Sequence, residues 1–350
     1  LTRLTRAPKN SCTITFAMGI ARVAAGCLKS ALIWRMRLSL DGLVVKEQSG
    51  FFWVEASDGQ TYICRLRGRL LEEAQASDIA AIGDHVTISL NEDGTGTVES
   101  VAERASVVSR ALRTAGNRGA GSPEREHVII ANADQALLVF AAAQPPPSLR
   151  MIDRFLVIVE KAGLERIVLV LNKIDLDSDG ESRRRFEIYE KLGYPVLATS
   201  ALEGIGIDDL RERLRGKISV FTGPSGVGKT SLLNRIQSGL GRAVKSVSRY
   251  SQEGMHTTRD SQMIKLDVGG YVADTPGLRT LAIWDVEPEE LDAYFIEIAR
   301  QVPQCRFADC THRAEPGCAV RQAVDQGDIS RSRYKSYLAL RDELEEAYAL

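Results

Sequence analysis

The alternation of apolar and polar residues changes along the chain and divides it into three patterned regions. From Leu43 to about Val108, short alternating runs are separated by Gly- and Asp-containing turns, which is typical of β-strands. From His127 to Ala273, near-continuous apolar runs alternate with amphipathic stretches, which indicates a buried parallel sheet with helices on both faces. From Trp284 onward the pattern is helical and charged. We therefore expect a multi-domain protein with a β-barrel, an α/β domain and a small α-helical domain.

The first patterned region is expected to form strands at residues 43–45, 51–54, 61–64, 86–90 and 96–98. Five strands within about 65 residues suit a small closed barrel of the OB type, and such barrels commonly bind oligonucleotides. Arg65, Arg67 and Arg69 are spaced by two, so one continuous strand would point all three toward one face as a candidate RNA-binding stripe. The alternative is a solvated edge that resists aggregation.

The second patterned region is expected to form strands at residues 128–130, 136–140, 167–171, 196–198, 218–221, 263–266 and 271–273. Amphipathic helices are predicted at residues 149–162, 183–192 and 207–214, and charged helices at 288–300 and 329–348 in the third region. Residues 109–126, rich in Arg and Gly, predict a flexible basic linker between barrel and α/β domain. That linker either adds RNA contacts or is simply solvated.

A glycine-rich stretch follows the strand at 218–221 and leads into a helix start. It matches G-x-x-x-x-G-K-[ST] without a gap, so its backbone N–H groups can approach phosphate oxygens. Lys229 would reach the β- and γ-phosphates, and the Thr230 hydroxyl would bind Mg²⁺. An ordinary glycine-rich turn is the alternative, which the Lys-Thr pair in register disfavours. The predicted nucleotide-binding residues here are Gly223, Pro224, Ser225, Gly226, Val227, Gly228, Lys229, Thr230 and Ser231.

Two upstream motifs indicate which base is bound. Asn172-Lys173-Ile174-Asp175 follows the strand at 167–171, and the Asp175 carboxylate can accept both hydrogen bonds that the guanine N1–H and N2–H₂ edge donates. Adenine offers neither donor there. Ser200-Ala201 ends the next strand, where a backbone N–H can meet guanine O6. At the ends of adjacent parallel strands, the two motifs together predict a guanine pocket.

A third motif, Asp274-Thr275-Pro276-Gly277, follows the last strand. Asp274 would hold Mg²⁺ through a water, and the Gly277 N–H would sense the γ-phosphate. The motif order is rotated relative to ordinary small GTPases, because the guanine motifs precede the phosphate loop. This order predicts a circular permutation, in which the second switch runs directly into the C-terminal region and can pull on it when γ-phosphate is lost.

The polar stretch from Gly239 to Asp260 suits a switch loop in which Thr257 or Thr258 meets Mg²⁺. Leu278 stands where many GTPases have a Gln that orients the attacking water. His256 is therefore the best internal candidate for that catalytic role. A loop histidine without a catalytic role is the alternative.

Three cysteines and one histidine lie close together near the C-terminus, as Cys305-x₄-Cys310-x-His312-x₅-Cys318. Three thiolates and an imidazole suit one tetrahedral Zn²⁺, and a site filled by four protein ligands is structural. Free cysteines in a helical domain are the alternative. The other cysteines are scattered, which favours a reducing compartment over a disulfide framework.

The net charge of −1 means that any basic surface must be local. Residues 1–40 are basic, rich in hydroxyl groups and free of acids, and their apolar part is too short to span a bilayer. We favour an extension outside the functional protein, because the regular pattern begins just after Met36. An organellar transit peptide is the alternative.

With these motifs the chain resembles the bacterial RsgA (YjeQ) family of GTPases, from about Asp41 to the C-terminus. The resemblance also rests on Gly42-Leu43-Val44-Val45, Cys64-Arg65-Leu66-Arg67-Gly68, Ala131-Asn132-Ala133-Asp134-Gln135 and Cys310-Thr311-His312-x-x-Glu315-Pro316-Gly317-Cys318. Residues 1–35 lie outside it, and Arg259 interrupts the family's usual run of Thr after the His that matches the proposed catalytic residue. The expected domains are an extension at 1–40, an OB-fold at 41–108, a basic linker at 109–126, a circularly permuted GTPase domain at 127–283 and a helical zinc-binding domain at 284–350.

The resemblance implies a GTP hydrolase that binds the immature small (30S) ribosomal subunit and leaves it on hydrolysis. It implies that the barrel and the zinc-binding domain contact rRNA, and that Zn²⁺ sits on Cys305, Cys310, His312 and Cys318. The expected cofactors are one structural Zn²⁺ and Mg²⁺ with GTP. We expect a cytoplasmic monomer that binds GTP or GDP and no membrane, or an organellar protein if residues 1–35 are a transit peptide.

Two other functions are consistent with parts of the sequence. In a nucleotide-gated RNA-binding module, the GTP state would set RNA affinity and hydrolysis would be incidental. A P-loop ATPase or kinase is the second alternative, and Asp175 argues against it because it matches guanine rather than adenine.

Overall fold

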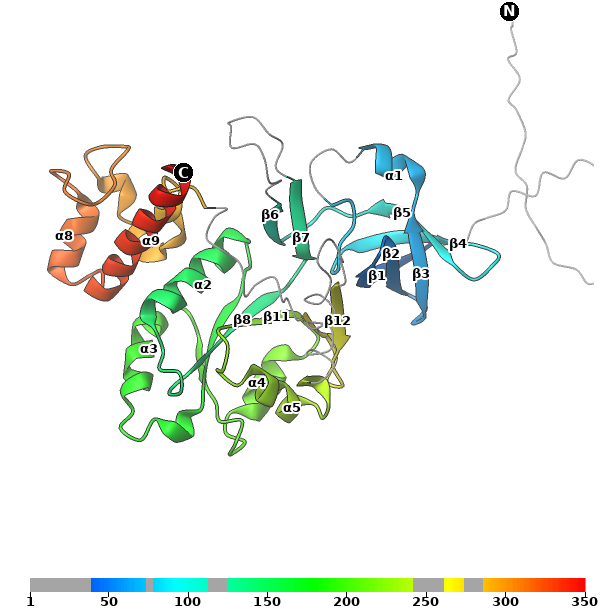
Figure 1. Cartoon of the computed structure of the whole chain (residues 1–350), viewed down its shortest axis with the longest axis horizontal. Coiled ribbons are helices and arrows are strands. Elements are labelled where there is room, and N and C mark those ends of the chain that lie inside the picture. The colour runs from blue at the N-terminus through cyan, green and yellow to red at the C-terminus, as the bar shows by residue number, and fades with distance from the viewer. Residues whose placement is uncertain (1–38, 74–77, 113–124, 242–260, 274–285, 350) are drawn as a thin grey trace, which may run out of the picture. The chain divides into compact units, whose positions relative to one another are not determined.

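The computed structural model describes residues 39–73, 78–112, 125–241, 261–273 and 286–349 (Figure 1). Five of the residues predicted to act in the GTPase cycle lie outside these ranges: His256, Thr257, Thr258, Asp274 and Gly277. Residues 1–38 of the extension predicted at 1–40 also lie outside them, whereas residues 39 and 40 belong to the first strand of the barrel.

The N-terminal strands close into the predicted barrel. They are β1 (Ser39–Gln48), β2 (Phe51–Ala56), β3 (Thr61–Leu66), β4 (His85–Leu90) and β5 (Gly96–Val101). Their order is β1-β2-β3-β5-β4, and β4 pairs back onto β1. β3 and β5 run parallel, whereas the other pairs are antiparallel. Alternate residues fill the interior, namely Val44, Phe52, Val54, Cys64, Ile88 and Val98.

A separate two-stranded ribbon follows the barrel, formed by β6 (Val107–Leu112) and β7 (Arg125–Ala131). Two predictions are corrected here. The basic linker does not span 109–126, because residues 109–112 and 125–126 belong to these strands. The apolar run at 128–130 pairs with β6 instead of joining the parallel sheet. A continuous apolar run reports burial on both faces but does not identify the partner strand.

The GTPase sheet has the order β10-β9-β8-β11-β13-β12. Its strands are β8 (Gln135–Ala141), β9 (Ile167–Asn172), β10 (Val196–Ala198), β11 (Ile218–Thr222), β12 (Ser261–Lys265) and β13 (Tyr271–Ala273). Neighbouring strands run parallel, except that β12 runs antiparallel to β13. The expectation of an entirely parallel sheet is therefore wrong for β12. The reason is the short connection at 266–270, since a parallel crossover needs a dozen or more residues.

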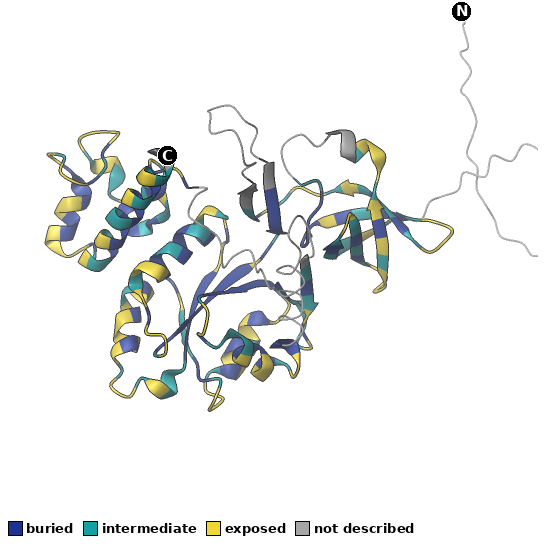
Figure 2. Ribbon diagram, viewed as in Figure 1, coloured by how far each residue is buried: buried dark blue, intermediate teal, exposed yellow. Residues whose placement is uncertain are grey.

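Helices cover both faces of this sheet, as predicted. Leu138 and Phe140 of β8 belong to one core with α2 (Leu149–Lys161) and α3 (Glu181–Leu192). The alternating residues Leu137 and Val139 belong to a second core with α4 (Ile207–Leu214) and α5 (Lys229–Ile236). The strands between these helices are almost wholly buried (Figure 2).

The barrel and the GTPase sheet are continuous. β1 pairs antiparallel with β12, so that Lys46 lies opposite Gln262 and Glu47 opposite Ser261. β12 is the strand that follows the predicted switch loop in the sequence. The barrel is therefore hydrogen-bonded to the strand at the end of that loop.

The stretch at 131–135, part of the family resemblance, forms a second joint between barrel and GTPase domain. Asn132 donates from Nδ2 to the Gly83 carbonyl (3.0 Å) and accepts from the Ala105 N–H (2.8 Å). Gly83 has φ +87°, and a Cβ there would lie 2.0 Å from the Ala131 carbonyl oxygen. Asp134 accepts from the Ile218 N–H (2.7 Å) at the start of β11. These contacts assign the stretch a structural role.

The C-terminal domain contains α7 (Ile296–Ala299), α8 (Ala319–Gln326) and α9 (Arg331–Ala349), with short 3₁₀ turns at Leu291–Tyr294 and Val302–Gln304. The predicted helix at 288–300 is interrupted at Phe295, which has extended backbone and a fully buried ring packed edge-on against Tyr337. The helix is broken at Phe295 so that the Phe295 ring can pack in the core. None of the helices in the described part of the chain combines the length and apolar composition that a membrane span requires.

Candidate nucleotide-binding and metal sites

The phosphate loop connects the end of β11 at Thr222 to the start of α5 at Lys229. Gly223 (φ +145°) and Gly228 (φ +95°) are required, because a Cβ would lie 2.1 Å from the Val139 carbonyl oxygen at the first and 2.4 Å from Asn172 Nδ2 at the second. The Lys229 ammonium donates to the Gly223 carbonyl (2.6 Å) within the loop. Backbone donors, the N-terminus of α5 and this lysine together form an anion-binding cradle.

Asn172 ties the guanine motifs to this loop. Its side chain is 1% exposed at the end of β9 and donates from Nδ2 to the Val227 carbonyl (2.8 Å). Its Oδ1 accepts from the Ala201 N–H (3.2 Å) and the Thr199 hydroxyl (3.3 Å). One buried amide therefore connects the ends of β9 and β10 with each other, as the sequence predicted for adjacent parallel strands, and with the phosphate loop at Val227.

Lys173 and Asp175 complete the pocket. Lys173 (φ +61°) donates from Nζ to the Gly226 carbonyl (2.7 Å). Asp175 lies in a 3₁₀ turn at Ile174–Leu176, and its Oδ1 accepts from the Ser200 hydroxyl (2.5 Å). The predicted residues of both guanine motifs thus meet beside the phosphate loop. A carboxylate held by one hydroxyl retains acceptor capacity for the two donors of a guanine edge.

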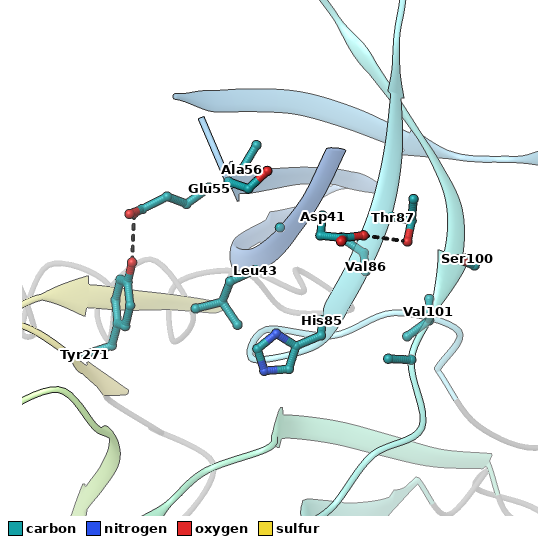
Figure 3. Close-up of a pocket in the computed structure, with 13 residues that line it drawn as sticks. Asp41, Leu43, Glu55, Ala56, His85, Val86, Thr87, Ser100, Val101 and Tyr271 are labelled. Carbon is teal, nitrogen blue, oxygen red and sulfur yellow. Dashed lines mark hydrogen bonds between the residues drawn. The ribbon is translucent and has the colours of Figure 1, made fainter. Parts of the chain in front are cut away.

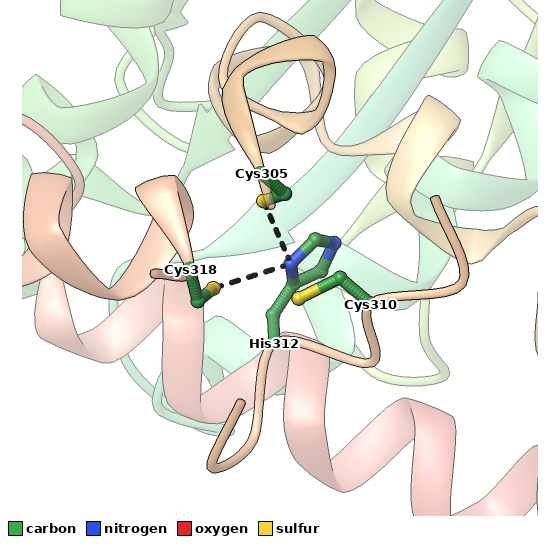
Figure 4. A group of neighbouring side chains, drawn as sticks. All are labelled: Cys305, Cys310, His312 and Cys318. Atoms are coloured by element: carbon green, nitrogen blue, oxygen red, sulfur yellow. Dashed lines mark hydrogen bonds between the residues drawn. The ribbon is translucent and has the colours of Figure 1, made fainter. Parts of the chain in front are cut away.

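The second site lies in the C-terminal domain, where the ligand atoms of Cys305, Cys310, His312 and Cys318 are within 4.8 Å of one another (Figure 4). His312 Nδ1 is 3.6 Å from Cys305 Sγ and 3.5 Å from Cys318 Sγ. Burial raises the pKa of the Cys310 thiol to about 12, so thiolates at this position need a nearby cation. The donor set fits a tetrahedral Zn²⁺, as predicted.

Two acids beside this cluster were not predicted as site residues. Asp292 Oδ2 lies 3.5 Å from His312 Nε2, on the side of the ring away from the sulfurs. Glu315 accepts from the N–H groups of Thr311 (2.9 Å), Arg313 (2.9 Å) and Ala314 (3.0 Å). Partial burial opposes ionisation of Glu315, but these hydrogen bonds and one from the Thr311 hydroxyl lower its pKa to about 2. Glu315 has a sequence signal in the resembling stretch, whereas Asp292 has none.

The expectation that Arg65, Arg67 and Arg69 share one face of a continuous strand is wrong. Strand β3 ends at Leu66, and Arg69 lies in a helix, α1 (Gly68–Glu73). Arg67 follows the strand and forms an ion pair with Glu99. Only Arg65 projects from β3, with its guanidinium 4.5 Å from the Phe51 ring centroid. Residues spaced by two point to the same face only within a continuous strand. Here the strand ends at Leu66 and a helix begins at Gly68.

A cavity of about 500 Å³ lies between the barrel and β13, and contains none of the predicted nucleotide ligands (Figure 3). Its polar lining includes Asp41, which accepts from the Thr87 hydroxyl (3.0 Å), and Glu55, which accepts from the Tyr271 hydroxyl (2.8 Å). The same Glu55 carboxylate accepts from Lys265 of β12. Glu55 therefore connects the barrel to both β12 and β13.

The fold and the order of the motifs define a circularly permuted GTPase, because strands β9 and β10, which carry the predicted guanine motifs, precede the phosphate loop. Residues 101–284 match the family model described as RsgA GTPase, and residues 41–98 match that of the RsgA N-terminal domain. The chain belongs to the RsgA family.

Relatives and solved structures agree with this assignment. The small ribosomal subunit biogenesis GTPase RsgA of Gemmatimonas aurantiaca is 42% identical over 311 residues, which cover 88% of this chain and 99% of that protein. The crystal structure of YjeQ from Thermotoga maritima is 40% identical with a TM-score of 0.70, covering 88% of this chain and 99% of that one. YloQ, described as a circularly permuted GTPase, is 30% identical with a TM-score of 0.69, covering 91% and 99%.

Proposed function

We propose that this protein hydrolyses GTP on the small ribosomal subunit late in subunit maturation, and that hydrolysis releases it. The observation that carries the proposal is the position of the Asn172 side-chain amide. It donates to the Val227 carbonyl in the phosphate loop and accepts from the Ala201 N–H in the predicted guanine motif. The relatives named small ribosomal subunit biogenesis GTPases supply the subunit as the partner.

Each predicted residue has a role in this proposal. Asp175 reads the guanine edge, while Lys229 contacts the β- and γ-phosphates. Thr230, Asp274 and either Thr257 or Thr258 would hold Mg²⁺, which neutralises charge on the phosphates. The Gly277 N–H senses the γ-phosphate, and His256 orients the attacking water. The barrel and the zinc-binding domain contact rRNA, and Zn²⁺ on its four ligands has a structural role.

The test is single-turnover GTP hydrolysis with and without purified small ribosomal subunits, and with large subunits as the matched control. We expect a large acceleration by small subunits alone. An unchanged slow rate would overturn the proposal and favour a nucleotide-gated RNA-binding module. Asp175→Asn, measured in parallel with xanthosine triphosphate, establishes that the accelerated reaction uses the guanine pocket.

A further inference from the structure

We propose that Arg235 is a positioning residue for guanine recognition. It anchors the loop at residues 201–205 to helix α5, so that the Ala201 N–H is held where guanine O6 can accept from it. The inference deepens the proposed function and rests on its guanine site. Arg235 lies outside all the nucleotide-binding motifs that the sequence predicts.

Arg235 lies in the last turn of α5, and its side chain contacts the loop through two hydrogen bonds. Its Nε donates to the Ala201 carbonyl (2.7 Å), and its Nη2 donates to the Leu202 carbonyl (2.6 Å). A guanidinium presents its donors in a rigid planar fork, so one fork that holds two consecutive carbonyls fixes their position relative to the helix. The loop that follows the buried Ser200 is therefore anchored to α5.

The loop depends on hydrogen bonds for its position, because its side chains contribute little packing. Leu202 is 74% exposed and Ile205 is 46% exposed. The turn is closed locally, since the Glu203 N–H donates to the Ser200 hydroxyl (3.1 Å) and the Gly204 N–H donates to the Ser200 carbonyl (2.8 Å). These bonds shape the turn, whereas the guanidinium fork fixes the position of the turn relative to α5.

Helix α5 is itself a fixed support for this fork. Arg211 of the neighbouring helix α4 donates from Nε to the Ile236 carbonyl (3.2 Å) and from Nη2 to the Arg235 carbonyl (2.5 Å) (Figure 1). Both helices also belong to one hydrophobic core with β8. Because α5 begins at Lys229, the phosphate loop and the loop at 201–205 are attached to opposite ends of one helix.

The group that the anchor positions is the Ala201 N–H. It donates to Asn172 Oδ1 at 3.2 Å, the long end of the normal range, so an acceptor that enters the pocket can share it. The preceding Ser200 is fully buried, and its hydroxyl donates to Asp175. Loss of the Arg235 anchor should therefore disturb the contact with guanine O6, while Asp175 keeps its place opposite the N1–H and 2-amino groups.

The experiment compares GTP with 6-thioguanosine triphosphate in the full-length, zinc-loaded protein. The analogue retains the N1–H and 2-amino donors but replaces O6 by sulfur, a weak acceptor. Competition against a fluorescent GDP analogue measures both affinities. We expect Arg235→Met to weaken GTP binding about three- to tenfold, as for the loss of one hydrogen bond, and to weaken binding of the analogue much less. Equal losses for both nucleotides, or an unchanged affinity for GTP, would overturn the proposal.

Two further variants separate the fork from its charge. Arg235→Lys keeps the charge but has no planar fork, so we expect a loss of GTP affinity between those of the native protein and Arg235→Met. Arg215→Met is the matched control, because the exposed Arg215 donates to Glu212 on α4 (2.9 Å), and it should leave both affinities unchanged. Native GTP affinity in Arg235→Lys, or an equal loss in Arg215→Met, would count against an anchoring fork.

The two proposals fail separately, because nucleotide affinity is measured without ribosomal subunits. Hydrolysis stimulated by small subunits, with unchanged GTP affinity in Arg235→Met, removes the positioning role and leaves the proposed function standing. A loss in Arg235→Met that is selective for O6, without any stimulation by subunits, does the reverse.

Discussion

The Arg333 guanidinium of helix α9 lies 2.6 Å from Asp153 Oδ1 of helix α2, inside the contact between the zinc-binding and GTPase domains. Both side chains are almost fully buried. Arg333 also makes two hydrogen bonds to Glu297 (2.6 and 3.0 Å), and the Tyr189 hydroxyl donates to Asp153 (2.7 Å). The C-terminal domain, which carries the cysteine-histidine cluster, is therefore joined to the GTPase domain at α2.

Arg333→Met should be strongly destabilising, because it leaves the carboxylates of Asp153 and Glu297 buried without their cation. Loss of one partner of a buried ion pair costs about 3–5 kcal/mol. Arg185→Met is the control, because Arg185 pairs with Glu181 on an exposed helix surface, where such pairs contribute about 0.5 kcal/mol or less. Urea unfolding curves of both variants test this, and similar midpoint shifts would contradict it.

Gly228→Ala should abolish GTP binding while the protein stays folded. Its Cβ would lie 2.4 Å from Asn172 Nδ2, the group that ties the guanine motifs to the phosphate loop. Gly163→Ala is the matched control, because Gly163 also has positive φ (+69°) but nothing within 4 Å of its Cβ. The control should lose about 1–2 kcal/mol of stability and retain GTP affinity. Equilibrium binding of a fluorescent GTP analogue separates the two effects.

Glu55→Gln should weaken the joint between barrel and GTPase domain in a pH-dependent manner. Burial opposes ionisation of Glu55, but hydrogen bonds from Lys265 and Tyr271 outweigh it and hold its pKa below the ordinary 4.5. A carboxylate with a lowered pKa stabilises the fold above its unfolded pKa, and this contribution disappears as the pH falls through the folded pKa. The native protein should therefore be more stable than Glu55→Gln at neutral pH, and the difference should shrink below pH 4.5. Thermal unfolding across this range tests it, and a constant difference would exclude the mechanism.

The parts of the protein that the sequence predicts correctly are those with local signals. The phosphate loop, Asn172 to Asp175 and the zinc ligands are contiguous or closely spaced motifs, and each is brought together as predicted. The pairing of β6 with β7 and the break at Phe295 depend on tertiary packing, which periodicity does not report. The connection of Arg333 to Asp153 spans 180 residues, so no motif could reveal it. The antiparallel direction of β12 could have been predicted from the sequence, because the connection between β12 and β13 is too short for the crossover that parallel strands need.

Asp292→Asn should lower the affinity of the cysteine-histidine cluster for Zn²⁺. The Asp292 carboxylate faces His312 Nε2 at 3.5 Å and would orient the ring so that Nδ1 points at the sulfurs. Loss of such a supporting carboxylate typically costs 10- to 100-fold in metal affinity. Competition with a chromogenic chelator measures the affinity.

Asp309→Asn is the matched control for that substitution, because Asp309 is adjacent to the ligand Cys310 but is exposed to solvent. It should leave the Zn²⁺ affinity unchanged. Removal of the metal from the native protein should also reduce the helix signal from α8 and α9, because their core includes the buried sulfurs of Cys310 and Cys318. Equal affinities for Asp292→Asn and Asp309→Asn would show that His312 is oriented by the fold alone.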